Sequence, residues 1–321
     1  MERLIFMGTP DFAVPALERL AGAGYDLTVV TQPDRPAGRG GVLAAPPVKQ
    51  TALARGLPVW QPPTLRDPDV VARIGALAPA AIVVVAYGEI LRQSILDIPP
   101  HGCLNLHPSL LPRWRGPTPI NAAILAGDTE TGVSVIRMDR GMDSGPLLGQ
   151  EPAPLLPDDT AATLGARLAQ QGAALLEYTL AGVLRGAGAA RPQSTEGVTI
   201  CRLLRKEDGR LDWHAAAAYL ARQVRAYDPW PGTFTTWDGR RLKILAAAPL
   251  PDGVAAGDDV PGQVRRVGEV VPAALDGNHR LAVQCGEGRL ELLRLQLEGK
   301  PAMAPAALLP GYPALARAQL T

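Results

Sequence analysis

Asn105 and His107 stand two positions apart at the end of an apolar run, with Pro108 directly after them. In a strand, residues so spaced point to the same face, about 7 Å apart along the chain. Proline cannot donate to a strand ladder, so we expect the strand to end at His107. In open α/β sheets, ligands bind beyond the carboxyl ends of the strands, where this amide and imidazole would converge. Such a pair also occurs in purely structural roles, so further residues must decide its function.

A loop from Asp139 to Gly145 follows another expected strand and carries two acids four positions apart, Asp139 and Asp143. Its glycines allow unusual backbone conformations. One interpretation is a turn with Asx-type hydrogen bonds. The other brings one acid beside His107, where it would orient the imidazole or raise its pKa.

Three more segments combine arginines with prolines and glycines. Residues 32–41 are too polar and too broken for a regular element, and they form either a plain connection or a cationic arm that approaches phosphates. Residues 113–117, with Trp114 between two arginines, have the composition of a surface loop. Residues 225–232 combine aromatics and prolines, which favours a fixed domain junction over a ligand site.

The elements that must position these residues alternate between strand and helix. We expect strands at Leu4–Met7, Asp26–Thr31, Ala81–Ala86, Cys103–His107 and Gly132–Met138, and helices at Phe12–Ala23, Pro47–Arg55, Asp67–Leu77, Glu89–Leu96 and Thr160–Leu184. Continuous β-branched runs suit strands that are covered on both faces, as in parallel sheets. The alternation predicts an α/β domain with a Rossmann-like, doubly wound and mostly parallel sheet. Gly8-Thr9-Pro10-Asp11 lacks the glycine fingerprint of a dinucleotide site.

The pattern changes after residue 184. Residues 185–204 are expected to link a catalytic domain, 1–184, to a second domain, 205–321. In that second domain we expect a helix at Trp213–Ala226 with Asp212 as its N-cap. Strands are expected at Thr233–Trp237, Arg241–Leu250, Gly262–Val267, Arg280–Cys285 and Arg289–Gln296, with a hairpin turn at Trp237–Arg240. About five short strands predict a small OB-like β-barrel.

Composition sets further bounds. A chain of 321 residues suits two domains. Residues 1–184 carry 14 Lys and Arg against 17 Asp and Glu, a net charge of −3, whereas residues 185–321 carry 18 against 14, a net charge of +4. The C-terminal part could therefore face a polyanion. The three cysteines show no CxxC spacing and are expected to be buried apolar residues. Without a signal-peptide pattern or an apolar run of about 18 residues, we expect a cytoplasmic protein outside the membrane.

Taken together, these segments resemble the methionyl-tRNA formyltransferase family nearly end to end. Matching stretches are Met7–Phe12, Thr31–Gly40, Val84–Gly88, Asn105–Gly116, Gly127–Val133 and Asp139–Gly145. The Asn-x-His…Asp core alone is similar to any folate-dependent formyltransferase. The arginine loop and the Arg225–Pro231 junction before a barrel narrow the resemblance to the tRNA enzymes. Pro117-Thr118 and Pro108 depart from common family residues and leave the local loop shape open, without touching the Asn/His/Asp set.

The resemblance implies transfer of a formyl group from 10-formyltetrahydrofolate, as co-substrate, to the α-amino group of methionyl-initiator tRNA, with no metal or nicotinamide. The substrate amine is itself the nucleophile, since its pKa near neutrality leaves much of it unprotonated. Asn105 and His107 would donate to the tetrahedral oxyanion. Asp143 would orient or charge His107 and help to move the proton to the leaving folate nitrogen.

The resemblance also implies the binding residues. The folate pocket would be lined by Ser109, Leu110, Leu111, Pro112, Val85, Tyr87, Gly88, Leu91 and Asp139. The candidates for binding tRNA are Arg35, Arg39, Lys206, Arg210 and Lys243. We expect a monomer.

Three other functions compete with this interpretation. Another folate-dependent formyltransferase, acting on a nucleotide or sugar amine, would share Asn105, His107 and Asp143 but lack the arginine loop and this barrel. A formyltetrahydrofolate hydrolase would use water as the acceptor and would not need the tRNA-facing residues. A nucleotide-binding oxidoreductase or non-catalytic module on the same scaffold would carry the glycine fingerprint that Gly8–Asp11 lacks.

Overall fold

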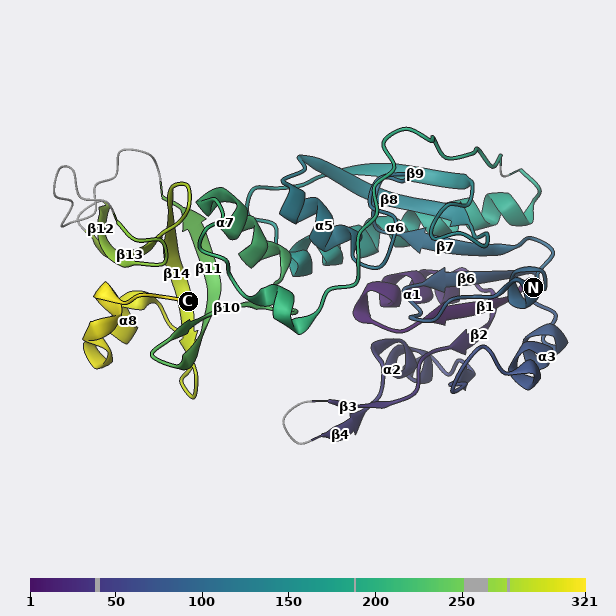
Figure 1. Ribbon diagram of the computed structural model, residues 1–321. Helices are drawn as coiled ribbons and strands as arrows, with labels where there is room; N and C mark the ends of the chain where they lie inside the picture. Colours follow the sequence, from purple (N-terminus) through teal and green to yellow (C-terminus); the bar gives the residue numbers. More distant parts are fainter. Residues whose placement is uncertain (38–40, 188, 251–264, 276–277) are drawn as a thin grey trace. The chain divides into compact units, whose positions relative to one another are not determined.

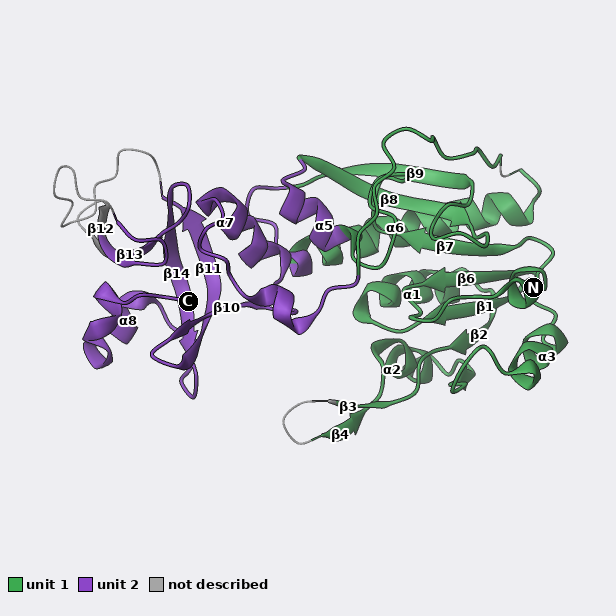
Figure 2. Ribbon diagram, in the orientation of Figure 1, with its two compact units in different colours: residues 1–119, 129–155, 163–202 green, residues 120–128, 156–162, 203–321 purple. Residues whose placement is uncertain are grey.

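The computed structural model describes residues 1–37, 41–187, 189–250, 265–275 and 278–321 (Figure 1). The chain forms two compact units (Figure 2). Unit 1 comprises Met1–Pro119, Thr129–Leu155 and Thr163–Arg202, and unit 2 comprises Ile120–Asp128, Leu156–Ala162 and Leu203–Thr321. The segment after residue 184 therefore lies with unit 1 as far as Arg202. Of the described helices, none combines the length and the apolar character needed to cross a bilayer.

Within its described residues, unit 1 is built on a sheet of seven strands in the order β5-β2-β1-β6-β7-β8-β9. The strands are β1 (Arg3–Gly8), β2 (Asp26–Val30), β5 (Val59–Trp60), β6 (Ala81–Val85), β7 (Cys103–His107), β8 (Glu130–Arg137) and β9 (Leu147–Pro154). The first five pair in parallel, whereas β8 pairs antiparallel with β7 and with β9. The predicted Rossmann-like, mostly parallel sheet is thus confirmed.

Helices cover both faces of this sheet. They are α1 (Val14–Gly22), α2 (Pro47–Ala54), α3 (Pro68–Ala76), α4 (Gln93–Leu96) and α6 (Ala161–Leu184). Ile74 of α3 and Ile95 of α4 pack with Ile82 and Cys103 on one face. On the other face, Gly172 of α6 lies so close to the Leu106 side chain that a Cβ would stand 2.8 Å from it. Because neighbours in a strand alternate between faces, Asn105 and His107 point away from α6.

Several elements of unit 1 differ from those expected. The 32–41 segment was expected to be irregular, but β3 (Arg35–Ala37) and β4 (Val42–Ala44) form an antiparallel hairpin. A pair of isolated strands has only edges, so it tolerates Pro36. The base of the hairpin is fixed where Asp34 accepts from Lys49 and from Gln61, at 2.8 and 2.7 Å. The strands β5 and β9 were not predicted, and neither was α5 (Pro119–Ala126), which lies in unit 2 apart from its first residue.

Unit 2 is a separate antiparallel sheet with one main helix. Its five described strands run in the order β10-β11-β14-β13-β12. They are β10 (Thr233–Trp237), β11 (Arg240–Pro249), β12 (Val270–Leu275), β13 (Asn278–Gln284) and β14 (Arg289–Leu297). Leu220 and Val224 of α7 (Ala217–Ala226) pack into the same core as Leu242 and Leu292 of the sheet. A short helix, α8 (Pro305–Leu308), and single 3-10 turns at Lys206–Gly209, Leu309–Gly311 and Pro313–Arg317 complete the unit.

The residues from Ala318 to Thr321 join the two edges of this sheet. On the β10 side, the backbone of Thr321 exchanges hydrogen bonds of 2.8 and 3.1 Å with Thr236. On the β12 side, Val270 donates to the Ala318 carbonyl at 2.8 Å, and Leu320 donates to Gly268 at 2.9 Å. The expected small barrel is therefore completed by a non-consecutive segment instead of by direct pairing of its edge strands.

Two boundaries in unit 2 were wrong. The helix begins at Ala217 with Ala216 as its N-cap, so Asp212 caps no helix and instead accepts from the His214 N–H in a turn. The strand expected at Gly262–Val267 lies partly outside the described residues, and 265–267 are irregular. The strand in this region is β12, which begins at Val270.

Candidate active site

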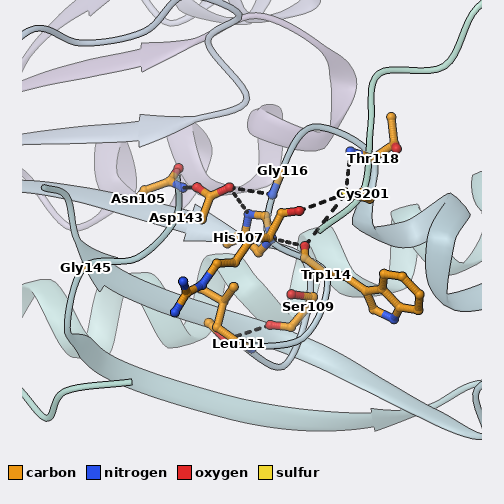
Figure 3. Close-up of polar contacts among 12 residues, drawn as sticks. Asn105, His107, Ser109, Leu111, Trp114, Gly116, Thr118, Asp143, Gly145 and Cys201 are labelled. Atoms are coloured by element: carbon orange, nitrogen blue, oxygen red, sulfur yellow. Dashed lines mark hydrogen bonds and ion pairs between the residues drawn. The ribbon is translucent and has the colours of Figure 1, made fainter. Parts of the chain in front are cut away.

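Asn105, His107 and Asp143 meet beside the carboxyl end of β7 (Figure 3). The Asn105 amide donates to Oδ1 of Asp143 at 3.3 Å, and Nδ1 of His107 lies 3.7 Å from Oδ2 of the same carboxylate. β7 ends at His107, as Pro108 requires. Asn105 and His107 are only 9% and 4% exposed, so these polar groups act on one another with little screening by solvent.

The proton positions on His107 follow from its second partner. Nε2 lies 2.9 Å from the Trp114 carbonyl, which can only accept, so Nε2 carries a proton. Burial lowers the pKa of His107 below its ordinary value of 6.5, against the opposing effects of the Asp143 carboxylate and the Trp114 carbonyl. The imidazole is therefore neutral at pH 7, and its unprotonated Nδ1 faces Asp143.

Asp143 is held in place by backbone as well as by side chains. The Gly116 N–H donates to its Oδ2 at 2.9 Å. Asp143 itself has φ of +50°, a conformation that L-residues other than Asn and Asp seldom adopt. Strained residues of this kind gather at functional sites, where the surrounding structure maintains them.

The loop that carries Trp114 and Gly116 is equally constrained. Trp114 has φ of +59° and Gly116 has φ of +109°. A Cβ on Gly116 would stand 2.4 Å from the Cys201 carbonyl oxygen, so only glycine fits there. This close approach lets the Gly116 N–H reach Asp143 while the Trp114 carbonyl reaches His107.

The residues expected to line a folate pocket lie at different depths. Ser109 is fully buried and donates to the Arg113 carbonyl at 2.6 Å, and Leu111 is held by the Ser134 hydroxyl at 3.2 Å. Leu110 packs over Gly132, and Pro112 is half-buried. The side chains of Val85, Tyr87 and Leu91 are buried in the protein core, whereas Gly88 is exposed.

Asp139 lines a cavity at the start of the loop that carries Asp143. That cavity has a volume of about 420 Å3, and its other walls include Gln93, Cys103 and Arg140. A second cavity, of about 540 Å3, is lined by Arg115, Ser144, Pro146, Pro192, Gln193, Ser194, Thr195 and Val198. The loop that carries Asp143 thus borders one cavity through Asp139 and the other through Ser144.

The basic residues proposed to contact tRNA are exposed wherever the structure describes them. Arg35 lies on β3, where its guanidinium donates to Gln32 at 3.3 Å. Arg39 falls outside the described residues. Lys206, Arg210 and Lys243 are exposed on unit 2.

The three candidates of unit 2 share Phe234 as a neighbour. Lys243 on β11 is the cross-strand partner of Phe234 on β10. Arg210 forms a β-bridge with Phe234. Lys206 and Phe234 line one cavity of about 410 Å3 together with Arg241. The Arg241 guanidinium stacks 3.5 Å from the Phe234 ring centre. The same cavity is also lined by two acids, Glu207 and Glu298, so the surface around Phe234 carries charges of both signs.

Sequence reasoning missed several residues that shape the site. Arg241 was not singled out; its cross-strand partner is Thr236, and its contact with Phe234 on the neighbouring strand carried no signal in the sequence. Gln193 and Ser134 carried no local signal, because their partners are distant in sequence. The three cysteines are buried, as expected, and burial raises the pKa of Cys103 and of Cys285 to about 12.

The chain is similar to known proteins in sequence and in fold. The sequence profile of the formyl transferase family matches residues 2–180, and that of the formyl transferase C-terminal domain matches residues 203–313. Among solved structures, HypX from Aquifex aeolicus in complex with tetrahydrofolic acid has a TM-score of 0.61 at 16% identity. It covers 96% of this chain, which spans only 47% of HypX. An N-formyltransferase from Helicobacter canadensis, in complex with folinic acid and dTDP-3-aminofucose, has a TM-score of 0.62 at 15% identity over 91% of this chain and 99% of that one.

Relatives at much higher identity cover almost the whole chain. The methionyl-tRNA formyltransferase of Chloroflexus aggregans is 49% identical over 96% of this chain and 97% of its own. That of Myxococcus xanthus is 45% identical over 97% of this chain and 95% of its own. With both domain profiles matched and this identity over nearly its full length, the chain belongs to the formyl transferase family, among the methionyl-tRNA formyltransferases.

Proposed function

We propose that this formyltransferase moves the formyl group of 10-formyltetrahydrofolate to the α-amino group of methionyl-initiator tRNA, giving N-formylmethionyl-tRNA for translation initiation. The observation that carries the chemistry is the state of His107. Its Nε2–H is committed to the Trp114 carbonyl, and its Nδ1 faces Asp143 as a free base. A neutral, oriented imidazole next to a carboxylate is suited to accepting and then returning one proton.

In the first step the substrate amine attacks the formyl carbon, and the carbonyl electron pair moves onto oxygen. The Asn105 amide has two N–H groups, and the one not directed at Asp143 is available to that oxyanion. Losing one such donor typically lowers kcat by about 100- to 1,000-fold.

The amine must lose a proton as the new C–N bond forms. His107 accepts it at Nδ1, and the Asp143 carboxylate stabilises the resulting imidazolium. Once protonated, Nδ1 also becomes a hydrogen-bond donor, so His107 can stabilise the oxyanion only after it has taken the proton. This adds an order of events to the sequence-based expectation that Asn105 and His107 donate to the oxyanion.

In the second step the tetrahedral intermediate collapses. The bond between the formyl carbon and N10 of the folate breaks, and the proton on His107 passes to N10, directly or through one water. The products are the formylated amine and tetrahydrofolate. The enzyme ends with the neutral imidazole with which it began, so no proton is gained or lost over the cycle.

We assign the two substrates to opposite sides of the Asp143 loop. The cavity beside Asp139 has polar and apolar walls, and we assign it to the folate. The cavity beside Ser144, with Arg115 in its wall, lies on the acceptor side. Arg35, Arg39, Lys206, Arg210 and Lys243, to which we add Arg241, would bind phosphates of the tRNA.

Formylation of purified, charged tRNAs tests this function. With 10-formyltetrahydrofolate, we expect methionyl-initiator tRNA to be formylated much faster than methionyl-elongator tRNA. Amino-sugar nucleotides and water are supplied as the competing acceptors. Faster transfer to an amino sugar, or release of formate at the same rate without tRNA, would assign the enzyme to one of the alternative activities instead.

A further inference from the structure

The segment from Arg191 to Cys201 joins the two loops that complete the active site, although it follows the last helix of the sheet domain. At its start, Arg191 exchanges backbone hydrogen bonds of 2.8 and 2.9 Å with Leu147, just after the Asp143 loop. Near its end, Thr199 and Cys201 pair with the backbone of Arg115 at 2.9 and 2.8 Å. The same segment therefore holds both the Asp143 loop and the loop that contains Trp114 and Gly116.

Gln193 is the side chain at the centre of this arrangement. Its amide nitrogen donates to the carbonyl of Asp143 at 2.7 Å and to that of Gly145 at 2.8 Å. Its amide oxygen accepts from the Arg115 guanidinium at 2.7 and 3.1 Å. One side chain thus connects the backbone of the Asp143 loop to a side chain of the other loop.

The contact bears on the backbone conformation of the loop. Asp143 has φ of +50°, in the left-handed region, and this conformation sets the direction of its carbonyl. The side-chain amide fixes this carbonyl and the one two residues later. Fixing both sets the direction in which the Asp143 carboxylate points towards His107 and Gly116.

We propose that Gln193 is a positioning residue for formyl transfer, which holds the Asp143 loop so that the carboxylate stays within reach of His107. The inference rests on the proposed function for its kinetic consequence and on geometry alone for its structural one. Gln193 also borders the cavity assigned to the acceptor, so the KM for tRNA separates a loss of acceptor binding from an effect on kcat through Asp143.

Gln193→Met tests the proposal, because methionine keeps the length of the side chain, adds no charge and removes both donors. We expect kcat to fall about 100-fold, the loss typical of a misplacement near 1 Å, with the KM values for folate and tRNA nearly unchanged. Gln171→Met is the matched control. The Gln171 side chain also donates to a backbone carbonyl, that of Pro152 at 2.9 Å, but Pro152 belongs to neither loop of the site. This variant should keep full activity.

A titration of His107 separates positioning from general damage. Asp143 raises the pKa of His107, so retreat of the carboxylate should lower the midpoint of the His107 imidazole signal in NMR spectra of the free enzyme. His107→Asn identifies the signal by its absence. Gln193→Ala provides a second variant should the methionine disturb packing, and it is expected to give the same shift.

The outcomes distinguish this inference from the proposed function. A lower midpoint with reduced kcat supports the positioning role. A folded Gln193 variant with the midpoint and kcat of the unmodified protein, or an equal loss in Gln171→Met, overturns it. If the unmodified protein fails to formylate methionyl-tRNA but the midpoint still moves, the proposed function fails and the positioning of Asp143 by Gln193 stands.

Discussion

Nδ1 of His107 lies 3.7 Å from Oδ2 of Asp143, beyond hydrogen-bond length but close enough for their charges to interact. The distance is what a resting base requires. A shorter contact would favour the imidazolium, which could accept no proton from the substrate amine. Burial favours the neutral form against the opposing effects of the Asp143 carboxylate and the Trp114 carbonyl, and the Trp114 carbonyl keeps the single proton on Nε2.

Folding stability should depend on pH through His107. Its pKa is lowered in the folded protein, so below about pH 6.5 the unfolded chain binds the proton more readily than the folded one. The free energy of unfolding should therefore be greatest above that pH and decrease as the pH falls towards the folded-state pKa. The slope should approach about 1.4 kcal/mol per pH unit. Urea unfolding over this range measures it.

His107→Asn is the matched variant for that measurement, because asparagine can still donate to the Trp114 carbonyl but does not titrate. The decrease in stability should be smaller in this variant. Equal pH dependence in the two proteins would contradict the neutral, buried state assigned to His107.

Asp143→Asn should leave the fold intact and lower kcat by about 100-fold or more, the usual contribution of acid–base catalysis. Asparagine can still accept from the Gly116 N–H, but it cannot stabilise an imidazolium. The pKa of His107 should fall further without the carboxylate, so the acidic limb of the pH–rate profile should move to lower pH. Asp26→Asn, at an exposed ion pair with Arg3, is the control and should change neither quantity.

Gly116→Ala should reduce activity sharply. The new Cβ would stand 2.4 Å from the Cys201 carbonyl oxygen in a backbone conformation with φ of +109°, so the loop must move and its N–H must leave Asp143. We expect a destabilisation of about 1–3 kcal/mol and a loss of kcat beyond what unfolding explains. Gly182→Ala, in α6 with no atom within 4 Å of the added Cβ, should instead stabilise the protein by about 0.5–1 kcal/mol. Thermal unfolding measures the stability of both variants, and kcat is measured for both at the same temperature.

Arg35→Ala and Arg39→Ala should each weaken tRNA binding without changing the KM for folate. If each arginine contacts one phosphate, the slope of log Kd against log salt should decrease by about 1 per substitution. Arg3→Ala removes an exposed arginine that pairs with Asp26 and should leave the slope unchanged. Parallel loss of folate and tRNA binding would refute the assignment.

The sequence made the centre of the site predictable for local reasons. β6 is a continuous apolar run, Pro108 ends β7, and the two-residue spacing of Asn105 and His107 in β7 fixes their common face. Both side chains do reach Asp143. Their catalytic roles remain predictions until the variants are measured.

Other elements were not predicted, because their sequences show neither the periodicity nor the residue propensities of a helix or a strand. β9 contains Pro152 and Pro154 and is an edge strand, where proline is tolerated but does not suggest a strand. α5 is apolar in most positions, so it shows no helical period. Gln193 lies in a segment whose composition predicts a linker. Its hydrogen-bond partners lie about fifty and eighty positions away in the chain, so no local pattern marks it.

The closure of the unit 2 barrel by residues 318–321 has a consequence for biosynthesis. Ring completion joins Thr236 to Thr321, and Gly268 to Leu320, so it needs contacts between distant parts of the chain. Folding slows as such contacts dominate, and domains made earlier on the ribosome fold first. The sheet domain precedes residues 203–321 in the chain and can acquire its structure while the barrel still awaits its final segment. The nascent chain would then hold Asn105, His107 and Asp143 in a folded sheet domain before the barrel is complete.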